Sequence, residues 1–112
     1  MNEELQIIDL VVGEGKKAVK GALITTQYRG LLEDGSEFDS SWSRGKPFQC
    51  VIGTGRVIKG WDQGIIGMQV GGKRELRVPA HLGYGERSVG SIPPNSNLRF
   101  EIELLEVLTR DD

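Results

Sequence analysis

Few side chains in this sequence could perform covalent chemistry. Asp39 is followed by Ser40 and Ser41, and the single histidine is His81, so the residue types of a hydrolase triad are all present. No nucleophile-elbow glycine pattern surrounds either serine. We therefore interpret the serines as part of a turn or bulge and His81 as a solvated loop residue, and we set an acid–base hydrolase aside.

Metal and phosphate chemistry have even less support. One histidine and one cysteine, Cys50, lie far apart in the sequence and are too few for a structural zinc site. Gly53-Thr54-Gly55 and Gly71-Gly72-Lys73 lack the spacing and the following helix of a phosphate loop, so we predict turns there. Cys50 is most simply a small buried apolar side chain in a strand. We expect neither a metal nor a cofactor.

The aromatic residues are the remaining candidates for a site. Because aromatic side chains dominate protein cores, the simplest interpretation of such a cluster, taken alone, is packing rather than a pocket. The apolar and aromatic residues concerned are Tyr28, Phe38, Phe48, Val57, Ile58, Trp61 and Phe100.

Composition predicts one domain over residues 1–112 that is mostly β. The chain of 112 residues is long enough to bury one hydrophobic core. Its 16 glycines are about twice the usual share of about 7%, which indicates many tight turns. The 14 basic and 16 acidic residues give a net charge of −2 with no basic block, which argues against a nucleic-acid partner.

The sequence also bears on the compartment. No apolar run approaches the ~20 residues that span a bilayer, and the acidic start, Met1-Asn2-Glu3-Glu4, lacks the regions of a signal peptide. A single cysteine cannot form an internal disulfide. We expect a cytoplasmic protein without membrane contact, and a monomer, because nothing in the sequence demands an oligomer.

Strands are predicted from apolar runs and turn residues. Asp34-Gly35 is a strong hairpin signal after the second run. Leu98 to Leu104 alternates apolar and charged residues, as a strand with one buried face does. The predicted strands cover residues 5–12 (an edge strand), 22–32, 47–52, 73–78 and 98–104.

Residues 57–68 have helical periodicity instead. Trp61, Ile65 and Met68 continue a stripe that begins at Val57 and Ile58. Three glycines in this segment weaken a helix by up to ~1 kcal/mol each relative to alanine, but they would let it lie close to a sheet. Five strands and one short helix predict an α+β fold, with the helix covering one face of the sheet.

A series of motifs, in one order along the chain, resembles the FKBP family of peptidyl-prolyl cis/trans isomerases. The motifs are Tyr28 with Leu32-Glu33-Asp34-Gly35, Phe38-Asp39-Ser40-Ser41, Lys46-Pro47-Phe48, Val57-Ile58-Lys59-Gly60-Trp61, Leu82-Gly83-Tyr84-Gly85, and Ile92-Pro93-Pro94 followed by Leu98-Arg99-Phe100. Together they cover nearly the whole chain, and the set is far more specific than any one motif.

The resemblance implies a half-barrel, a twisted antiparallel sheet wrapped over one short helix, with a pocket between them. It implies that tacrolimus and rapamycin bind in the same pocket. Residues matching the family's catalytic positions are Tyr28, Phe38, Asp39, Trp61, Tyr84 and Phe100, and those matching its substrate- or macrolide-binding positions are Arg44, Phe48, Val57, Ile58 and Ile92.

This sequence departs from the family pattern at two places. The loop from Gly85 to Ile92 is one residue shorter than in the best-known small member, and Arg56 occupies a position that is often acidic. Both are expected at the pocket rim, where they bear on inhibitor and partner preference more than on the chemistry.

The implied residues suit rotation about an X-Pro bond. The barrier of ~18–20 kcal/mol comes from amide resonance, so a catalyst has to favour the twisted amide and needs no nucleophile. An apolar pocket removes the water that stabilises the polar planar form. We expect Trp61 to form the floor for the proline ring, the Ile58 N–H and Tyr84 hydroxyl to donate to substrate, and Asp39 to pair with Arg44 or the Tyr28 hydroxyl.

Two functions fit this resemblance. The first is an active isomerase acting on proline-containing polypeptides, and the second is a non-catalytic binding module that keeps the fold and docks on a partner. The complete aromatic set, with Asp39 and Tyr84 both present, favours the isomerase.

Overall fold

β6 (Leu98–Leu108) is the central strand of the sheet in the computed structural model, which describes residues 4–110. Its first seven residues alternate between buried and half-buried side chains, because successive residues of a strand point to opposite faces. β2 (Leu23–Leu32) and β5 (Lys73–Val78) pair with it on either side, both antiparallel. β1 (Gln6–Val11) forms the edge beyond β5, so the predicted edge strand is confirmed.

Two strands share the other edge of β2. β3 (Glu37–Ser40) pairs with the end of β2, and β4 (Phe48–Val51) pairs with its beginning. The Asp34-Gly35 turn joins β2 to β3, so the predicted hairpin is confirmed. Between β3 and β4 the chain leaves the sheet through the single helical turn α1 (Ser41–Arg44).

The prediction of five strands and one helix was therefore one strand and one helix short. β3 and α1 have four residues each, which is too short for a hydrophobic period to be visible. Local contacts define α1 instead: the side chain of Ser40 accepts the Ser43 N–H at 3.2 Å, and Gly45 ends the turn with φ of 70°. A further turn, the 3₁₀ helix η1 (Ala80–Leu82), follows β5.

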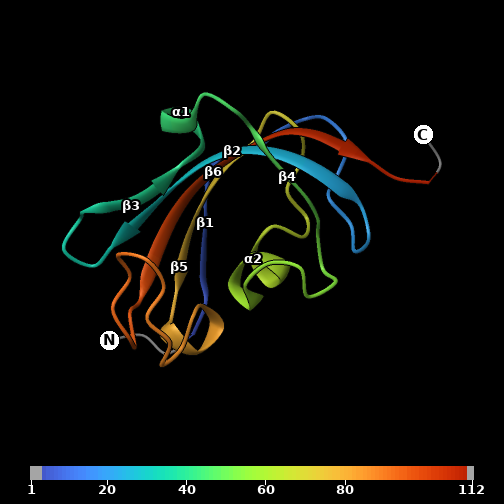
Figure 1. Cartoon of the computed structure of the whole chain (residues 1–112). Helices are drawn as coiled ribbons and strands as arrows, with labels where there is room; N and C mark the ends of the chain where they lie inside the picture. The colour runs from blue at the N-terminus through green and yellow to red at the C-terminus, as the bar shows by residue number, and fades with distance from the viewer. Residues whose placement is uncertain (1–3, 111–112) are drawn as a thin grey trace.

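α2 (Lys59–Gly64) lies in the concave face of the sheet, which curves around it (Figure 1). It is shorter than the predicted helix over 57–68, because Ile58 has extended backbone with ψ of 151° and Ile65 ends the helix. A Cβ at Gly60 would lie 2.6 Å from Val78 Cγ1, so only glycine allows this approach of helix and strand. Gly60, although glycine weakens a helix, is thus the residue that permits α2 to pack against β5.

The core fills the space between α2 and the sheet. It combines the inward side chains of β2, β5 and β6 with Trp61, Ile65 and Met68. Cys50, in β4, is buried with them, as the sequence predicted. The architecture is the expected α+β fold. No helix within the described part of the chain is long and apolar enough to cross a membrane.

Candidate active site

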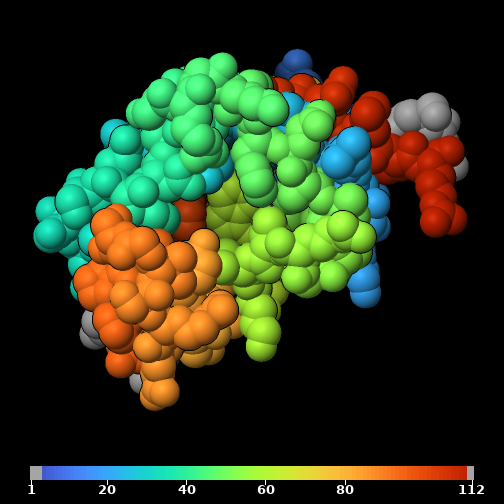
Figure 2. Space-filling view, viewed as in Figure 1, coloured from blue at the N-terminus to red at the C-terminus, as the bar shows by residue number. Residues whose placement is uncertain are grey.

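A hollow of about 750 Å³ opens between α2, the β2–β3 end of the sheet and the loop that follows η1. We call it the aromatic hollow. In Figure 2 it is the recess between the teal, orange and yellow-green segments, with the olive of α2 at its floor. Its lining residues are Tyr28, Phe38, Asp39, Phe48, Gly55, Arg56, Val57, Ile58, Lys59, Trp61, His81, Gly83, Tyr84, Gly85, Arg87 and Phe100.

Trp61 is the centre of the aromatic packing. Its ring meets those of Tyr28, Phe48 and Phe100 edge to face, with centroids 5.0, 5.7 and 5.5 Å apart. Phe38 packs edge to face on Phe100 at 5.7 Å and extends this wall. Trp61 is only 4% exposed, and its buried indole N–H has no acceptor among residues 4–110. The floor of the hollow is therefore apolar and held from three sides.

The Asp39 carboxylate accepts hydrogen bonds from two side chains and one backbone N–H. The Tyr28 hydroxyl donates to Oδ2, and Arg44 donates to Oδ1, which also accepts the Ser40 backbone N–H at 2.8 Å. Burial, followed by the hydrogen bond to Asp39, raises the pKa of Tyr28 above its ordinary value of 10.0. The two pairings that the sequence left as alternatives thus occur together.

Arg44 does not line the aromatic hollow itself, but it contacts Tyr28 and Asp39, which do. Its guanidinium lies 5.6 Å from the Tyr28 ring centroid, and its second terminal nitrogen donates to the Tyr28 hydroxyl at 3.3 Å. These contacts hold the Asp39 carboxylate and the Tyr28 hydroxyl next to each other.

Two hydrogen-bond donors in the hollow are unused. The Tyr84 hydroxyl and the Ile58 backbone N–H, at the start of α2, make no hydrogen bond to any described residue. Burial raises the pKa of Tyr84 above 10.0, so the phenol keeps its proton near neutral pH. A bound carbonyl could accept from either group.

Ile92 is the other predicted site residue outside the lining. It is 5% exposed, belongs to the core and forms a bridge with Val89 through hydrogen bonds of 2.8 and 3.1 Å. It therefore anchors the loop before β6 that carries Arg87.

His81 corrects one expectation. The sequence analysis interpreted it as a solvated loop residue. Its side chain is exposed, but it lies in the 3₁₀ turn η1 and lines the aromatic hollow. Arg56 also lines the hollow, at the rim where the sequence analysis expected it. Lys59 and Arg87 line the hollow too and were missed as site residues. Lys59 belongs to a matched motif and Arg87 lies two positions after another, which is the signal that would have found them.

The serines next to Asp39 have structural roles. Ser40 caps α1, and Ser41 Oγ accepts the Tyr28 N–H at 2.7 Å and donates to Gln27 Oε1 at 2.5 Å. Neither serine lines the aromatic hollow. The two serine hydroxyls form hydrogen bonds with Ser43, Tyr28 and Gln27, and within residues 4–110 neither hydroxyl bonds His81.

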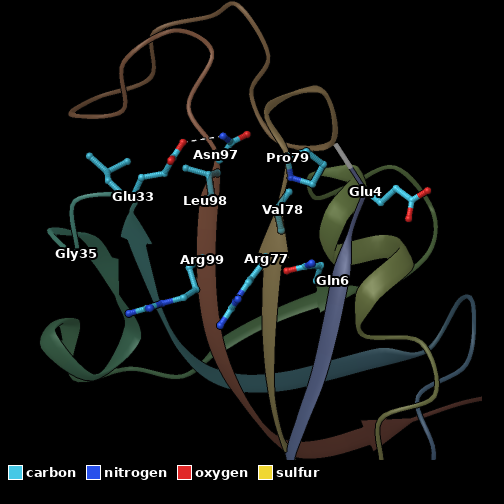
Figure 3. Close-up of a pocket in the computed structure, with 11 residues that line it drawn as sticks. Glu4, Gln6, Glu33, Gly35, Arg77, Val78, Pro79, Asn97, Leu98 and Arg99 are labelled. Atoms are coloured by element: carbon cyan, nitrogen blue, oxygen red, sulfur yellow. Dashed lines mark hydrogen bonds between the residues drawn. The ribbon is translucent and has the colours of Figure 1, made fainter. Parts of the chain in front are cut away.

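A second, smaller hollow of about 250 Å³ lies where β5 ends and β6 begins, and Arg77, Val78, Leu98 and Arg99 are among its lining residues (Figure 3). Arg77 and Arg99 face each other across these strands, and Asn97 donates to Glu33 at 2.6 Å. Arg77 is bonded to Glu75 at 2.7 Å. No aromatic side chain lines this hollow, so it offers nothing for a proline ring.

Comparisons with known proteins agree with this geometry. The family model for FKBP-type peptidyl-prolyl cis-trans isomerases matches residues 14–105. An FK506-binding protein of Neisseria meningitidis serogroup A is 54% identical over 104 residues, which cover 92% of this chain and 95% of that protein. A chloroplastic peptidyl-prolyl cis-trans isomerase of Arabidopsis thaliana is 52% identical over 113 residues, covering 90% of this chain and 54% of its own length.

Solved structures show the same likeness. The crystal structure of AtFKBP13 superposes with a TM-score of 0.87 at 50% identity and covers 93% of each chain. FkpA from Escherichia coli superposes with a TM-score of 0.85 at 40% identity, over 92% of this chain and 47% of that one.

Proposed function

The chain belongs to the family of FKBP-type peptidyl-prolyl cis-trans isomerases, and from this premise we propose that it turns X-Pro bonds in the aromatic hollow, with the proline ring over Trp61. The observation that carries the proposal is the packing of three aromatic rings around Trp61, beneath two unused hydrogen-bond donors. The substrates are proline-containing segments of polypeptides.

The aromatic hollow suits this reaction because rotation needs a change of environment and no bond making. The planar amide is polar and is well solvated by water, whereas the twisted amide has lost its resonance and is less polar. Transfer into an apolar hollow removes that solvation and lowers the relative cost of twisting. Trp61, Phe100 and Phe38 supply the apolar surface that excludes water.

The two unused donors orient the substrate. The Ile58 N–H and the Tyr84 hydroxyl can each hold one substrate carbonyl, so the chain is fixed on either side of the rotating bond. Asp39, held by Tyr28 and Arg44, keeps that wall of the hollow in one shape. Val57 and Phe48 add apolar contact to the substrate at the mouth.

The two tryptophans give a matched test of the assignment. Trp61→Leu should reduce kcat/KM in a protease-independent assay on a short X-Pro peptide, because it removes the floor of the hollow. Trp42→Leu is the control, since Trp42 lies in α1, is 49% exposed and does not line the hollow. Circular dichroism checks that both variants fold. Wild-type turnover by a folded Trp61→Leu protein would contradict the assignment.

The same assay separates the isomerase from a non-catalytic binding module. A module would bind X-Pro peptides without accelerating their isomerisation. Family membership and the intact Asp39–Tyr28 pair favour turnover.

Tacrolimus and rapamycin are proposed inhibitors of this site. A relative at 54% identity is named an FK506-binding protein, and the apolar hollow is large enough to admit part of a macrolide. Binding should change the fluorescence of Trp61, which is measured in a Trp42→Phe background so that one tryptophan reports. Unchanged emission and unchanged isomerase activity at saturating macrolide would overturn this proposal.

We also propose that the protein acts as a monomer in the cytoplasm. The single cysteine is buried and can form no internal disulfide, which fits a reducing compartment. Light scattering tests the monomer, and fractionation of the source cells tests the compartment.

A further inference from the structure

The charges that line the aromatic hollow are almost all positive. Arg56, Lys59 and Arg87 line it, together with the titratable His81, and the one acidic side chain there is Asp39. Asp39 is already bonded to Arg44. The chain as a whole has a net charge of −2, so this excess of positive charge is local to the mouth of the hollow.

These three cations have no acidic partners. Within residues 4–110 none of Arg56, Lys59 and Arg87 forms a salt bridge, and all three are exposed. The sheet arginines differ: Arg29 bonds Glu101 at 2.9 Å, and Arg74 bonds Asp9 at 2.7 Å. The charges at the hollow are therefore available to a bound molecule.

The cations stand on two sides of the opening. Arg56 and Lys59 flank the Val57-Ile58 segment that leads into α2, on the yellow-green side of the recess in Figure 2. Arg87 belongs to the loop after η1, a segment that is orange in Figure 2, and its backbone N–H donates to Tyr84 O at 3.1 Å. Both Arg87 and Tyr84 line the aromatic hollow.

We propose that this positive rim makes the hollow favour segments with aspartate or glutamate next to the X-Pro bond over otherwise identical segments with a neutral polar or a basic residue there. The inference rests on the proposed isomerase function of the same hollow. The proline ring enters the apolar floor, while its neighbours in the peptide emerge at the rim beside Arg56, Lys59 and Arg87. One exposed ion pair changes binding by about 1.4- to fivefold, and facing charges of one sign also steer association.

Peptides matched in all but one residue test the inference. Two sets carry Glu, Gln or Lys, either directly before the proline or directly after it, and kcat/KM is measured without a coupling protease. We expect Glu to exceed Gln by about two- to fivefold in at least one set, and Lys to fall below Gln. The difference in kcat/KM between the Glu and Lys peptides should be smaller at about 1 M salt than at about 0.1 M. Charges act over about 3 Å at the higher salt concentration and over about 10 Å at the lower one.

A variant locates the effect at the rim. In Arg56→Gln/Lys59→Gln/Arg87→Gln the ratio of kcat/KM for the Glu and Lys peptides should fall to about one. The control Lys17→Gln/Lys20→Gln/Arg110→Gln makes the same change in net charge at exposed positions outside the hollow, and it should keep the wild-type ratio.

The outcomes separate this inference from the proposed function. Turnover of the Gln peptides with no preference for Glu in either set overturns the rim inference and leaves the isomerase standing. A preference that survives in the rim variant also overturns it, because the selectivity then lies elsewhere. Failure to turn over any of the peptides overturns the proposed function itself.

Discussion

Phe38 packs so closely on Gly30 that a Cβ at position 30 would lie 2.4 Å from Phe38 Cζ. Gly30 is also the cross-strand partner of Asp39 on β3 and of Phe100 on β6. A residue without a side chain therefore lies behind three members of the site. Because Gly30 has no Cβ, the Phe38 ring can lie against β2 and form part of the wall of the aromatic hollow.

Gly30→Ala should displace Phe38 and lower kcat/KM, with a loss of about 1–3 kcal/mol in the free energy of unfolding from overpacking. Gly35→Ala is the control: with φ of 87° and nothing within 4 Å of its Cβ, it should cost about 1–2 kcal/mol of stability and leave kcat/KM unchanged. Peptide isomerisation and urea unfolding measure the two quantities. Full activity in Gly30→Ala would show that the Phe38 ring position does not matter.

The Tyr84 hydroxyl and the Asp39 carboxylate should differ in their importance for turnover. Tyr84→Phe removes a donor that has no protein partner, so kcat/KM should fall by at most about tenfold, the worth of roughly one neutral hydrogen bond. Asp39→Leu should cost more, because it leaves the Tyr28 hydroxyl and Arg44 without their acceptor.

Asp39→Asn, which keeps an acceptor oxygen, should lie between these variants. Steady-state kinetics on one neutral peptide rank the three. Complete loss of activity in a folded Tyr84→Phe protein would point to a chemical role for that hydroxyl beyond holding a carbonyl.

The contact between α2 and β5 should appear as coupling between two positions. Gly60→Ala places a Cβ 2.6 Å from Val78 Cγ1 and should destabilise the protein by about 1–3 kcal/mol. Val78→Ala opens space at the same point, so the double variant should lose less than the sum of the single losses. Urea unfolding of the four proteins gives the coupling, and strict additivity would argue that helix and strand do not meet there.

Cys50 should make stability depend on pH under alkaline conditions. Burial raises the pKa of its thiol from 9.0 to about 11. The unfolded chain therefore loses this proton first as the pH rises, so the contribution is complete below about pH 9 and is lost by about pH 11.

The test is the difference in free energy of unfolding between the wild type and Cys50→Ala, which should fall across that window. The tyrosines titrate in both proteins and cancel. A constant difference from pH 8 to pH 11 would mean that the thiol is solvated in the native state.

Turnover of a neutral peptide should be nearly flat between about pH 6 and 8 and insensitive to a chelator. Burial raises the pKa of both Tyr28 and Tyr84, so both phenols stay protonated throughout this range. A rotation that transfers no proton gives no bell-shaped profile. Because His81 lines the hollow, His81→Ala is the informative comparison. A steep profile that this variant abolishes would indicate acid–base chemistry, contrary to the mechanism proposed here.

Alternation and turn residues were sufficient to predict the long elements. Lys73 to Val78 was predicted with the same bounds that β5 has, since Pro79 cannot continue the strand. Leu98 to Leu104 was recognised from alternation, but β6 continues to Leu108 because its pairing with β2 extends it. These features are local in sequence and need no knowledge of the rest of the chain.

The length of α2 and the positive charge at the rim of the hollow could be seen only in the tertiary structure. The periodicity over residues 57–68 marks the residues that face the core, but the helix covers only Lys59–Gly64, and Gly60 and Gly64 allow it to lie close to Val78 and Leu76 of β5. Asp39, Tyr28 and Arg44 lie up to 16 positions apart, and their pairing follows from the β2–β3 register. Arg87 and Arg56 lie further apart in the sequence still, and they come to one opening because the sheet curves around α2. Residue types determined what each side chain can do. The long-range packing determined which side chains lie together in one site.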